Sequence, residues 1–150
     1  MSLEAEYDLD FYAWINQNVE LLRRGCLSEI DAEHIAQELE SMGKRDRRQL
    51  RSRLQVLIMH LLKWQYQPDQ QSQSWLATID HQRDQIEALL LDSPSLRGDL
   101  ETALVTVYSK ALRDAHRETS LPETVFPLSC PFALAEILAP DFLPSSECER

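Results

Sequence analysis

The chain has 150 residues, of which 43% are hydrophobic and 27% are charged, with 7 prolines and only 3 glycines. This composition excludes collagen-like, low-complexity and wholly disordered proteins. A chain of this length buries enough surface to fold without disulfides or a structural metal, so we predict one domain over residues 1–150, with an ordered core over residues 7–144 and loose termini. Because 25 acidic residues outnumber 15 basic ones, the formal charge is −10, which disfavours general adhesion to nucleic acid or to anionic membranes.

Two further features concern the compartment. No apolar run approaches the roughly 18 residues of a membrane span, and residues Met1–Glu6 lack the basic start and the apolar stretch of a secretory signal. The cysteines Cys26, Cys130 and Cys148 are odd in number and form no C-x-x-C pair, so neither a disulfide framework nor a thiolate zinc site is indicated. We therefore expect a cytoplasmic protein with no membrane contact.

Apolar residues recur at helical spacing along almost the whole chain, and no segment shows the alternation of a strand. The first predicted helix begins after a cap at Asp8 or Asp10 and ends at Gly25, where a left-handed residue is favourable. Its apolar residues share one face: Phe11, Trp14, Ile15, Val19 and Leu22.

The second predicted helix begins at a cap formed by Ser28 or Asp31. It carries a short apolar stripe: Ile35, Leu39 and Met42. Gly43 either ends this helix or lets it bend into the next one.

The segment from Lys44 to Tyr66 is predicted to be a helix whose second half, Val56 to Trp64, is apolar on all sides. Such a helix is typical of a buried central position. Pro68 ends it, Ser72 or Ser74 caps the following helix, and Ser93-Pro94 opens another.

Cys130-Pro131 begins a short helix close to the C-terminus. These elements predict an all-α, single-domain bundle of about five main helices plus a short C-terminal helix, about two-thirds helical, with Val56 to Trp64 as its buried central helix.

Six motifs occur in order between Tyr7 and Pro144, and together they are specific. They are Tyr7-Asp8-x-Asp10-Phe11-x-x-Trp14, Glu38-Leu39-Glu40-x-Met42-Gly43, His60-Leu61-Leu62-Lys63-Trp64-Gln65-x-Gln67-Pro68, Ser74-Trp75-x-x-Thr78-Ile79, Ser93-Pro94-Ser95-Leu96 and Phe126-Pro127-x-x-Cys130-Pro131. In these motifs the chain resembles the bacterial domain-of-unknown-function family 29. The resemblance implies a compact α-helical bacterial protein and supplies no catalytic residues.

His60 is the most unusual single residue, because it lies inside the apolar run of the predicted central helix. A buried imidazole must find hydrogen-bond partners or stay neutral. One interpretation makes His60 a general base or metal ligand that faces Glu38 or Glu40. The other, which we favour, makes it a core residue bonded to a side chain of a neighbouring helix, such as Glu38 or Thr78.

His34, Glu38 and His60 form a weak candidate for a two-histidine, one-carboxylate metal site. Di-metal sites in bundles use repeated Glu-x-x-His, and no glutamate precedes any histidine of this chain at that distance. We therefore predict neither a metal site nor a cofactor.

A basic cluster stands out in this acidic chain: Lys44, Arg45, Arg47, Arg48, Arg51 and Arg53, opposed only by Asp46. Within it, Lys44, Arg47, Arg48 and Arg51 form a candidate interaction surface, here named the basic stripe. Three interpretations are open: pairing with the acidic residues of the preceding helix, binding of an acidic protein, or binding of nucleic acid phosphates.

Other polar and aromatic residues admit two interpretations each. Cys130 lies at a helix start, where the pKa of a thiol falls, so it is either a reactive thiolate or a small packed residue. Ser74 and Thr78 are better explained as helix-start hydroxyls than as nucleophiles. The aromatic residues Trp14, Trp64, Trp75, Tyr12 and Tyr66 either line a ligand pocket or belong to the core.

The leading hypothesis is a non-enzymatic module that binds or regulates another protein through the basic stripe or the acidic C-terminal tail. A small enzyme or metal-binding protein centred on His60 and Glu38 is the first alternative. Nucleic-acid binding through the stripe is the second and the less expected one. Homo-oligomerisation stays open, because bundles with a spare apolar face often dimerise.

Overall fold

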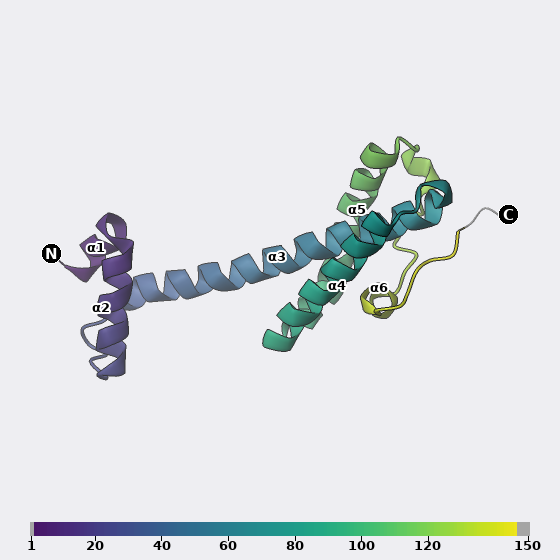
Figure 1. Cartoon of the computed structure of the whole chain (residues 1–150). Helices are drawn as coiled ribbons and strands as arrows, with labels where there is room; N and C mark the ends of the chain where they lie inside the picture. The colour runs from purple at the N-terminus through teal and green to yellow at the C-terminus, as the bar shows by residue number, and fades with distance from the viewer. Residues whose placement is uncertain (1, 147–150) are drawn as a thin grey trace. The chain divides into compact units, whose positions relative to one another are not determined.

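A computed structural model describes residues 2–146, and Cys148 therefore lies outside the described residues. The described chain is 76% helical and contains no strand, which confirms the all-α prediction. The helices are α1 (Leu3–Leu9), α2 (Phe11–Arg23), α3 (Ala32–Tyr66), α4 (Gln73–Asp92), α5 (Leu96–Thr119) and α6 (Leu134–Leu138), with short 3-10 turns at Pro68–Gln70 and Glu123–Val125 (Figure 1).

The chain divides into two compact units, residues 1–45 and 46–150, which we name the N-terminal and C-terminal units. The division falls inside α3, so each unit includes part of that helix. The prediction of a single domain concerns independent folding and stays a prediction. None of the helices in the described residues is both long enough and apolar enough to cross a membrane.

The N-terminal unit contains one helix more than predicted. Ser2 caps α1, whose seven residues were too few to show a period in the sequence. Asp10 ends α1 and caps α2, since its side chain accepts a hydrogen bond from the backbone N–H of Ala13 at 3.1 Å. At the far end of α2, Gly25 has a φ of 74°, and the N–H of Cys26 bonds the carbonyl of Leu21, as in a Schellman motif.

Helix α3 joins two predicted helices into one of 35 residues. It runs through Gly43, whose missing side chain faces open space, so glycine neither ends the helix nor bends it around a neighbour. Of the two proposed N-terminal caps, Asp31 acts as the cap: its carboxylate accepts a hydrogen bond from the backbone N–H of His34.

The hydrophobic core lies in the C-terminal unit, around the second half of α3 (Figure 1). There Leu57, Ile58, Leu61 and Leu62 are completely buried, which confirms the predicted buried central helix. Apolar residues of α4, α5 and α6 pack against them, and the fully buried ones include Ile79, Ile86, Leu100, Ala111 and Ile137.

The predicted helix starts in this unit need small corrections. Ser72, rather than Ser74, caps α4 through the backbone N–H of Trp75. Helix α5 begins at Leu96, because the residues from Ser93 to Ser95 form a turn in which the N–H of Leu96 bonds the carbonyl of Ser93.

The chain after α6 is held by Arg83 of α4, which is buried although it is a cation. Its guanidinium donates hydrogen bonds to the backbone carbonyls of Ile137 at 2.8 Å, Pro140 at 3.3 Å and Phe142 at 2.7 Å. One side chain therefore satisfies three backbone carbonyls, at the end of α6 and in the irregular segment that follows it.

Candidate functional site

The structure places half of the basic stripe in an ion-pair cluster. Arg47 and Arg51 both bind the carboxylate of Asp99 on α5, at 3.1 and 2.7 Å. The hydrogen bond from Arg51 holds the pKa of Asp99 below its usual value. Lys44 and Arg48 are exposed. The acidic partner thus comes from α5, and not from the acidic residues at the start of α3.

His60 and the residues proposed as its partners form hydrogen bonds with other groups. His60 is half-buried, and its Nδ1 atom lies 2.9 Å from the carbonyl oxygen of Val56, one turn earlier in α3. Burial lowers the pKa of His60, so the neutral ring is favoured. Thr78 donates a hydrogen bond to the carbonyl of Ser74, while Glu38 belongs to the N-terminal unit and accepts a hydrogen bond from Tyr7. The expected partner on a neighbouring helix is therefore replaced by the backbone of α3.

Within residues 2–146, no group of three or more His, Cys, Asp or Glu side chains is arranged to hold a metal ion. Of the proposed ligands, His34 bonds Asp31 and Glu38 bonds Tyr7.

Cys130 does not have the environment of a reactive thiolate. Burial raises the pKa of its thiol, which donates a hydrogen bond to the carbonyl of Phe132 at 3.3 Å. The packed interpretation of Cys130 is therefore the better one.

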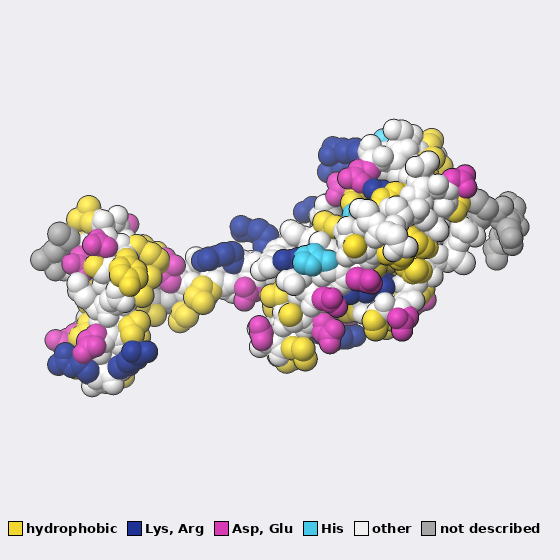
Figure 2. All heavy atoms as spheres, viewed as in Figure 1, with side chains coloured by type: hydrophobic (Ala, Val, Ile, Leu, Met, Phe, Trp, Pro, Cys, Tyr) yellow, Lys and Arg dark blue, Asp and Glu magenta, His cyan; other side chains and the backbone are white. Residues whose placement is uncertain are grey.

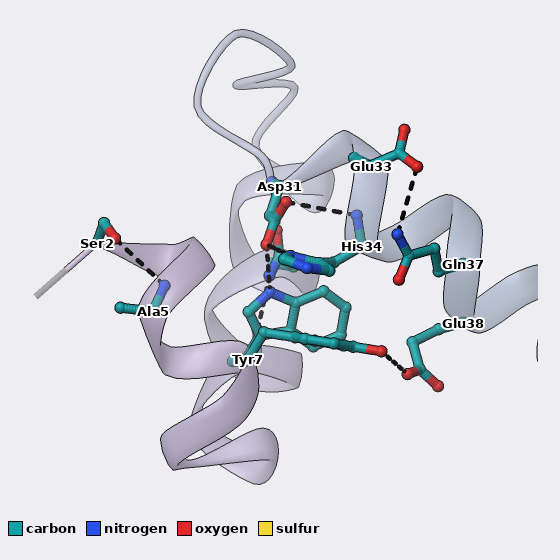
Figure 3. A network of polar contacts seen from close by, with 10 residues as sticks. Ser2, Ala5, Tyr7, Asp31, Glu33, His34, Gln37 and Glu38 are labelled. Carbon is teal, nitrogen blue, oxygen red and sulfur yellow. Dashed lines mark hydrogen bonds and ion pairs between the residues drawn. The ribbon is translucent and has the colours of Figure 1, made fainter.

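A different site emerges in the N-terminal unit, where a polar network surrounds the carboxylate of Asp31 (Figure 3). The Asp31 atom Oδ2 accepts a hydrogen bond from the indole N–H of Trp14 at 2.9 Å and lies 2.6 Å from Nδ1 of His34. Burial alone would raise the pKa of Asp31, but the hydrogen bonds from Trp14 and His34 outweigh it and leave the pKa below its usual value. Asn18 closes the network by accepting the backbone N–H of Asp31 and donating to the carbonyl of Trp14.

Aromatic rings complete this network. The ring of Tyr7 stacks on that of His34, with centroids 4.0 Å apart, and meets Trp14 edge to face at 4.9 Å. The hydroxyl of Tyr7 donates a hydrogen bond to Glu38 (Figure 3). Phe11 stacks on Trp14, with centroids 5.5 Å apart, and meets Tyr7 edge to face at 5.7 Å. Contacts among α1, α2 and α3 therefore hold the rings in place although this unit contributes nothing to the main core.

Beside the network, α2 and α3 form an apolar groove of about 460 Å³. Trp14 and Asn18 lie in its lining, Glu38 and Arg45 supply its charges, and the remaining lining is apolar: Phe11, Ile15, Val19, Leu22, Ile35, Leu39 and Met42. Five of these side chains are exposed to solvent, with exposed fractions of 45% for Phe11, 37% for Val19, 43% for Leu22, 62% for Leu39 and 55% for Met42. Figure 2 shows hydrophobic side chains at the surface of this unit.

The sequence revealed these apolar faces but did not reveal that they are uncovered. Their helical spacing is the same as that of a core face, and only the short length of the N-terminal unit hints that few residues are available to cover them. The spacing of these residues in the sequence indicates neither the contact of Trp14 with Asp31 nor that of Tyr7 with Glu38. Of the other aromatic residues, Tyr12 is exposed, and Trp75 lies under the Lys63 ammonium, 4.6 Å from it.

No curated protein and no solved structure matches the chain. The family model described as "Domain of unknown function DUF29" matches residues 6–143, nearly the whole chain. The resemblance seen in the six motifs is thereby confirmed, and the chain belongs to the DUF29 family.

Proposed function

We propose that this protein is a protein-interaction module and that the apolar groove of the N-terminal unit binds a helix of a different protein. The observation that carries the proposal is the exposure of five large apolar side chains along one groove. Contiguous exposed apolar surface on a small unit is typical of a binding site.

The shape of the groove favours a helix as its occupant. The lining residues Phe11, Ile15, Val19 and Leu22 follow helical spacing on α2, and Ile35, Leu39 and Met42 do so on α3. A third helix with apolar residues at positions i, i+3 or i+4, and i+7 would fill the space between these two faces, as in other helix-in-groove complexes. The polar network beneath fixes Trp14 and Glu38 before binding, which lowers the entropy cost of association.

The net charge argues against a second copy of this chain as the occupant. Residues 1–45 contain ten acidic and four basic residues, a formal charge of −6, so two such units facing each other would repel. The basic stripe is a weaker docking surface than the groove, because Asp99 already binds two of its four cations.

Selection from a library of random 20-residue peptides on the immobilised protein tests this proposal. Selected peptides are then measured against a groove variant, Leu39→Ser with Met42→Ser, and against a control variant, Val105→Ser with Leu128→Ser, which alters two still more exposed apolar residues of the C-terminal unit. We expect peptides with helical apolar spacing that bind the control normally and bind the groove variant about tenfold more weakly, since burying two such side chains contributes more than 1.4 kcal/mol. Peptides that bind the groove variant as well as the unaltered protein would refute the proposal, and circular dichroism verifies that both variants are folded.

A further inference from the structure

We infer that a cavity in the C-terminal unit binds a small organic anion, namely a carboxylate with an apolar body. The cavity has a volume of about 400 Å³ and is formed by the end of α4, the start of α5 and the chain at the end of α6. This volume falls within the range of small-molecule sites, about 300–1,000 Å³. The cavity shares no residue with the apolar groove, so the inference is independent of the proposed function.

Most of the residues that line this cavity are apolar. They come from α4, from α6 and from the chain just after α6: Ile86, Leu90, Leu91, Leu138 and Pro140. Such a lining favours a ligand with a hydrocarbon body, because binding removes apolar surface of both molecules from water. Three charged residues complete the lining: Arg83, Arg97 and Glu87.

Arg83 places a buried positive charge beside the cavity. Among the described residues it forms no ion pair, since its guanidinium is bonded to three backbone carbonyls, which carry no net charge. Buried charges in proteins are normally paired with an opposite charge. Asp80 and Asp141 favour the charged form, but burial outweighs them and lowers the pKa of Arg83, and neither carboxylate lines the cavity. A buried charge is screened less than a surface charge, so Arg83 makes the cavity favourable for an anion.

Arg97 brings a second cation to the same cavity, from an exposed position in the first turn of α5. Within residues 2–146 its side chain forms neither an ion pair nor a hydrogen bond, so its guanidinium is not committed to another group. Glu87 opposes the two arginines, and the lining keeps a formal charge of +1 in a chain of −10. The cavity is therefore a locally cationic site in an acidic protein.

These features favour a carboxylate over other polar groups. A carboxylate can accept two parallel hydrogen bonds from one guanidinium, whereas an ammonium group would be repelled by both arginines. An uncharged amide would gain little from either cation. We therefore expect the carboxylate to bind Arg97 within the field of Arg83, and the hydrocarbon body to pack on the leucines of the lining.

Nuclear magnetic resonance titrations of the nitrogen-15-labelled full-length protein test the inference with three probes of equal chain length: octanoate, octanamide and octylammonium. We expect octanoate to bind at least about tenfold more tightly than the other two and to shift the amide signals of residues 83–97 and 138–140. Arg97→Gln should weaken octanoate binding at least about threefold without affecting octanamide, and Glu87→Gln should strengthen octanoate binding. Arg113→Gln is the matched control, because Arg113 is also an exposed arginine of α5 without an ion pair among the described residues, and it lies outside the cavity lining.

Several results would overturn the inference. If octanamide binds this cavity as tightly as octanoate does, the arginines do not select an anion. Tighter binding of octylammonium would mean that Glu87 dominates the field. Octanoate that shifts no signals around the cavity, or that Arg113→Gln weakens as much as Arg97→Gln does, would show that the cavity is not an anion site. The amide spectrum of each variant verifies that it is folded, and Arg83 is left unaltered because it holds the chain after α6.

Discussion

Replacing Arg83 with methionine should destabilise the C-terminal unit strongly, because a single buried guanidinium satisfies three backbone carbonyls. Arg83 has an exposed fraction of 5%, and its bonds of 2.7, 2.8 and 3.3 Å reach residues on both sides of Pro140. Hydrogen bonds to a charged donor contribute about 1.5–3 kcal/mol each, and the long bond contributes least. Desolvation of the guanidinium offsets part of this, so we expect Arg83→Met to lower the free energy of unfolding by about 3–5 kcal/mol.

Urea denaturation followed by circular dichroism measures this loss, and Arg83→Lys is the matched comparison. Lysine keeps the positive charge but brings one nitrogen where arginine brings three, so it should recover less than half of the lost stability. Hydrogen exchange should show residues 134–143 losing protection first. A loss below about 1 kcal/mol for Arg83→Met, or complete rescue by lysine, would refute the idea that the three-way hydrogen bonding stabilises this segment.

Three further predictions concern individual positions. Gly43→Ala should raise the free energy of unfolding by about 0.4–1 kcal/mol, because a methyl group there meets no atom and alanine favours the helix; thermal unfolding measures the gain, and a loss would show that the glycine is needed. The pKa of Asp31 is lower in the folded protein than in the unfolded chain, so the ionised carboxylate stabilises the fold above the unfolded pKa, and this stabilisation is lost as pH falls through the folded pKa. The Asp31→Asn variant should therefore be less stable at neutral pH, and urea titrations should show that its stability depends less on pH in the acid range. The lowered pKa of His60 means that the unfolded chain binds this proton more readily, so stability should fall as pH drops below about 6.5; His60→Gln should reduce that slope, and an NMR titration of the ring at or above 6.5 would contradict the burial argument.

Local sequence patterns were enough to predict most of the helices in the C-terminal unit. An all-round apolar stretch predicts a buried helix whatever surrounds it, which is why Val56 to Trp64 was placed correctly. Pro68 and the serine caps act on the backbone within a few residues, so their effects are readable without knowing the fold, to within one or two positions.

Pairings between distant segments were not readable in this way. The basic stripe shows that cations are present, but Asp99 becomes their partner only because α5 packs on α3 some 50 residues later in the chain. His60 illustrates the same limit, since the sequence suggested a side-chain partner and the nearest acceptor was the carbonyl of Val56 in its own helix.

The site in the N-terminal unit was missed for a related reason. Periodicity identifies an apolar face but carries no information about what covers it, so the spacing of Val19 and Leu39 did not indicate that these side chains are exposed. Helix α1 escaped detection because seven residues span only two turns.

Asp10 links α1 and α2 more tightly than their separate boundaries suggest. Its backbone N–H bonds the carbonyl of Glu6 in α1, its carbonyl accepts the N–H of Trp14, and its side chain caps the N–H of Ala13 in α2. Asp10 is the only residue between the two helices, and it belongs to the hydrogen-bonding pattern of both. Unwinding of either helix at this point would therefore break hydrogen bonds of the other. The two helices should therefore open as one cooperative unit, and their amide hydrogens near Asp10 should exchange at a common rate.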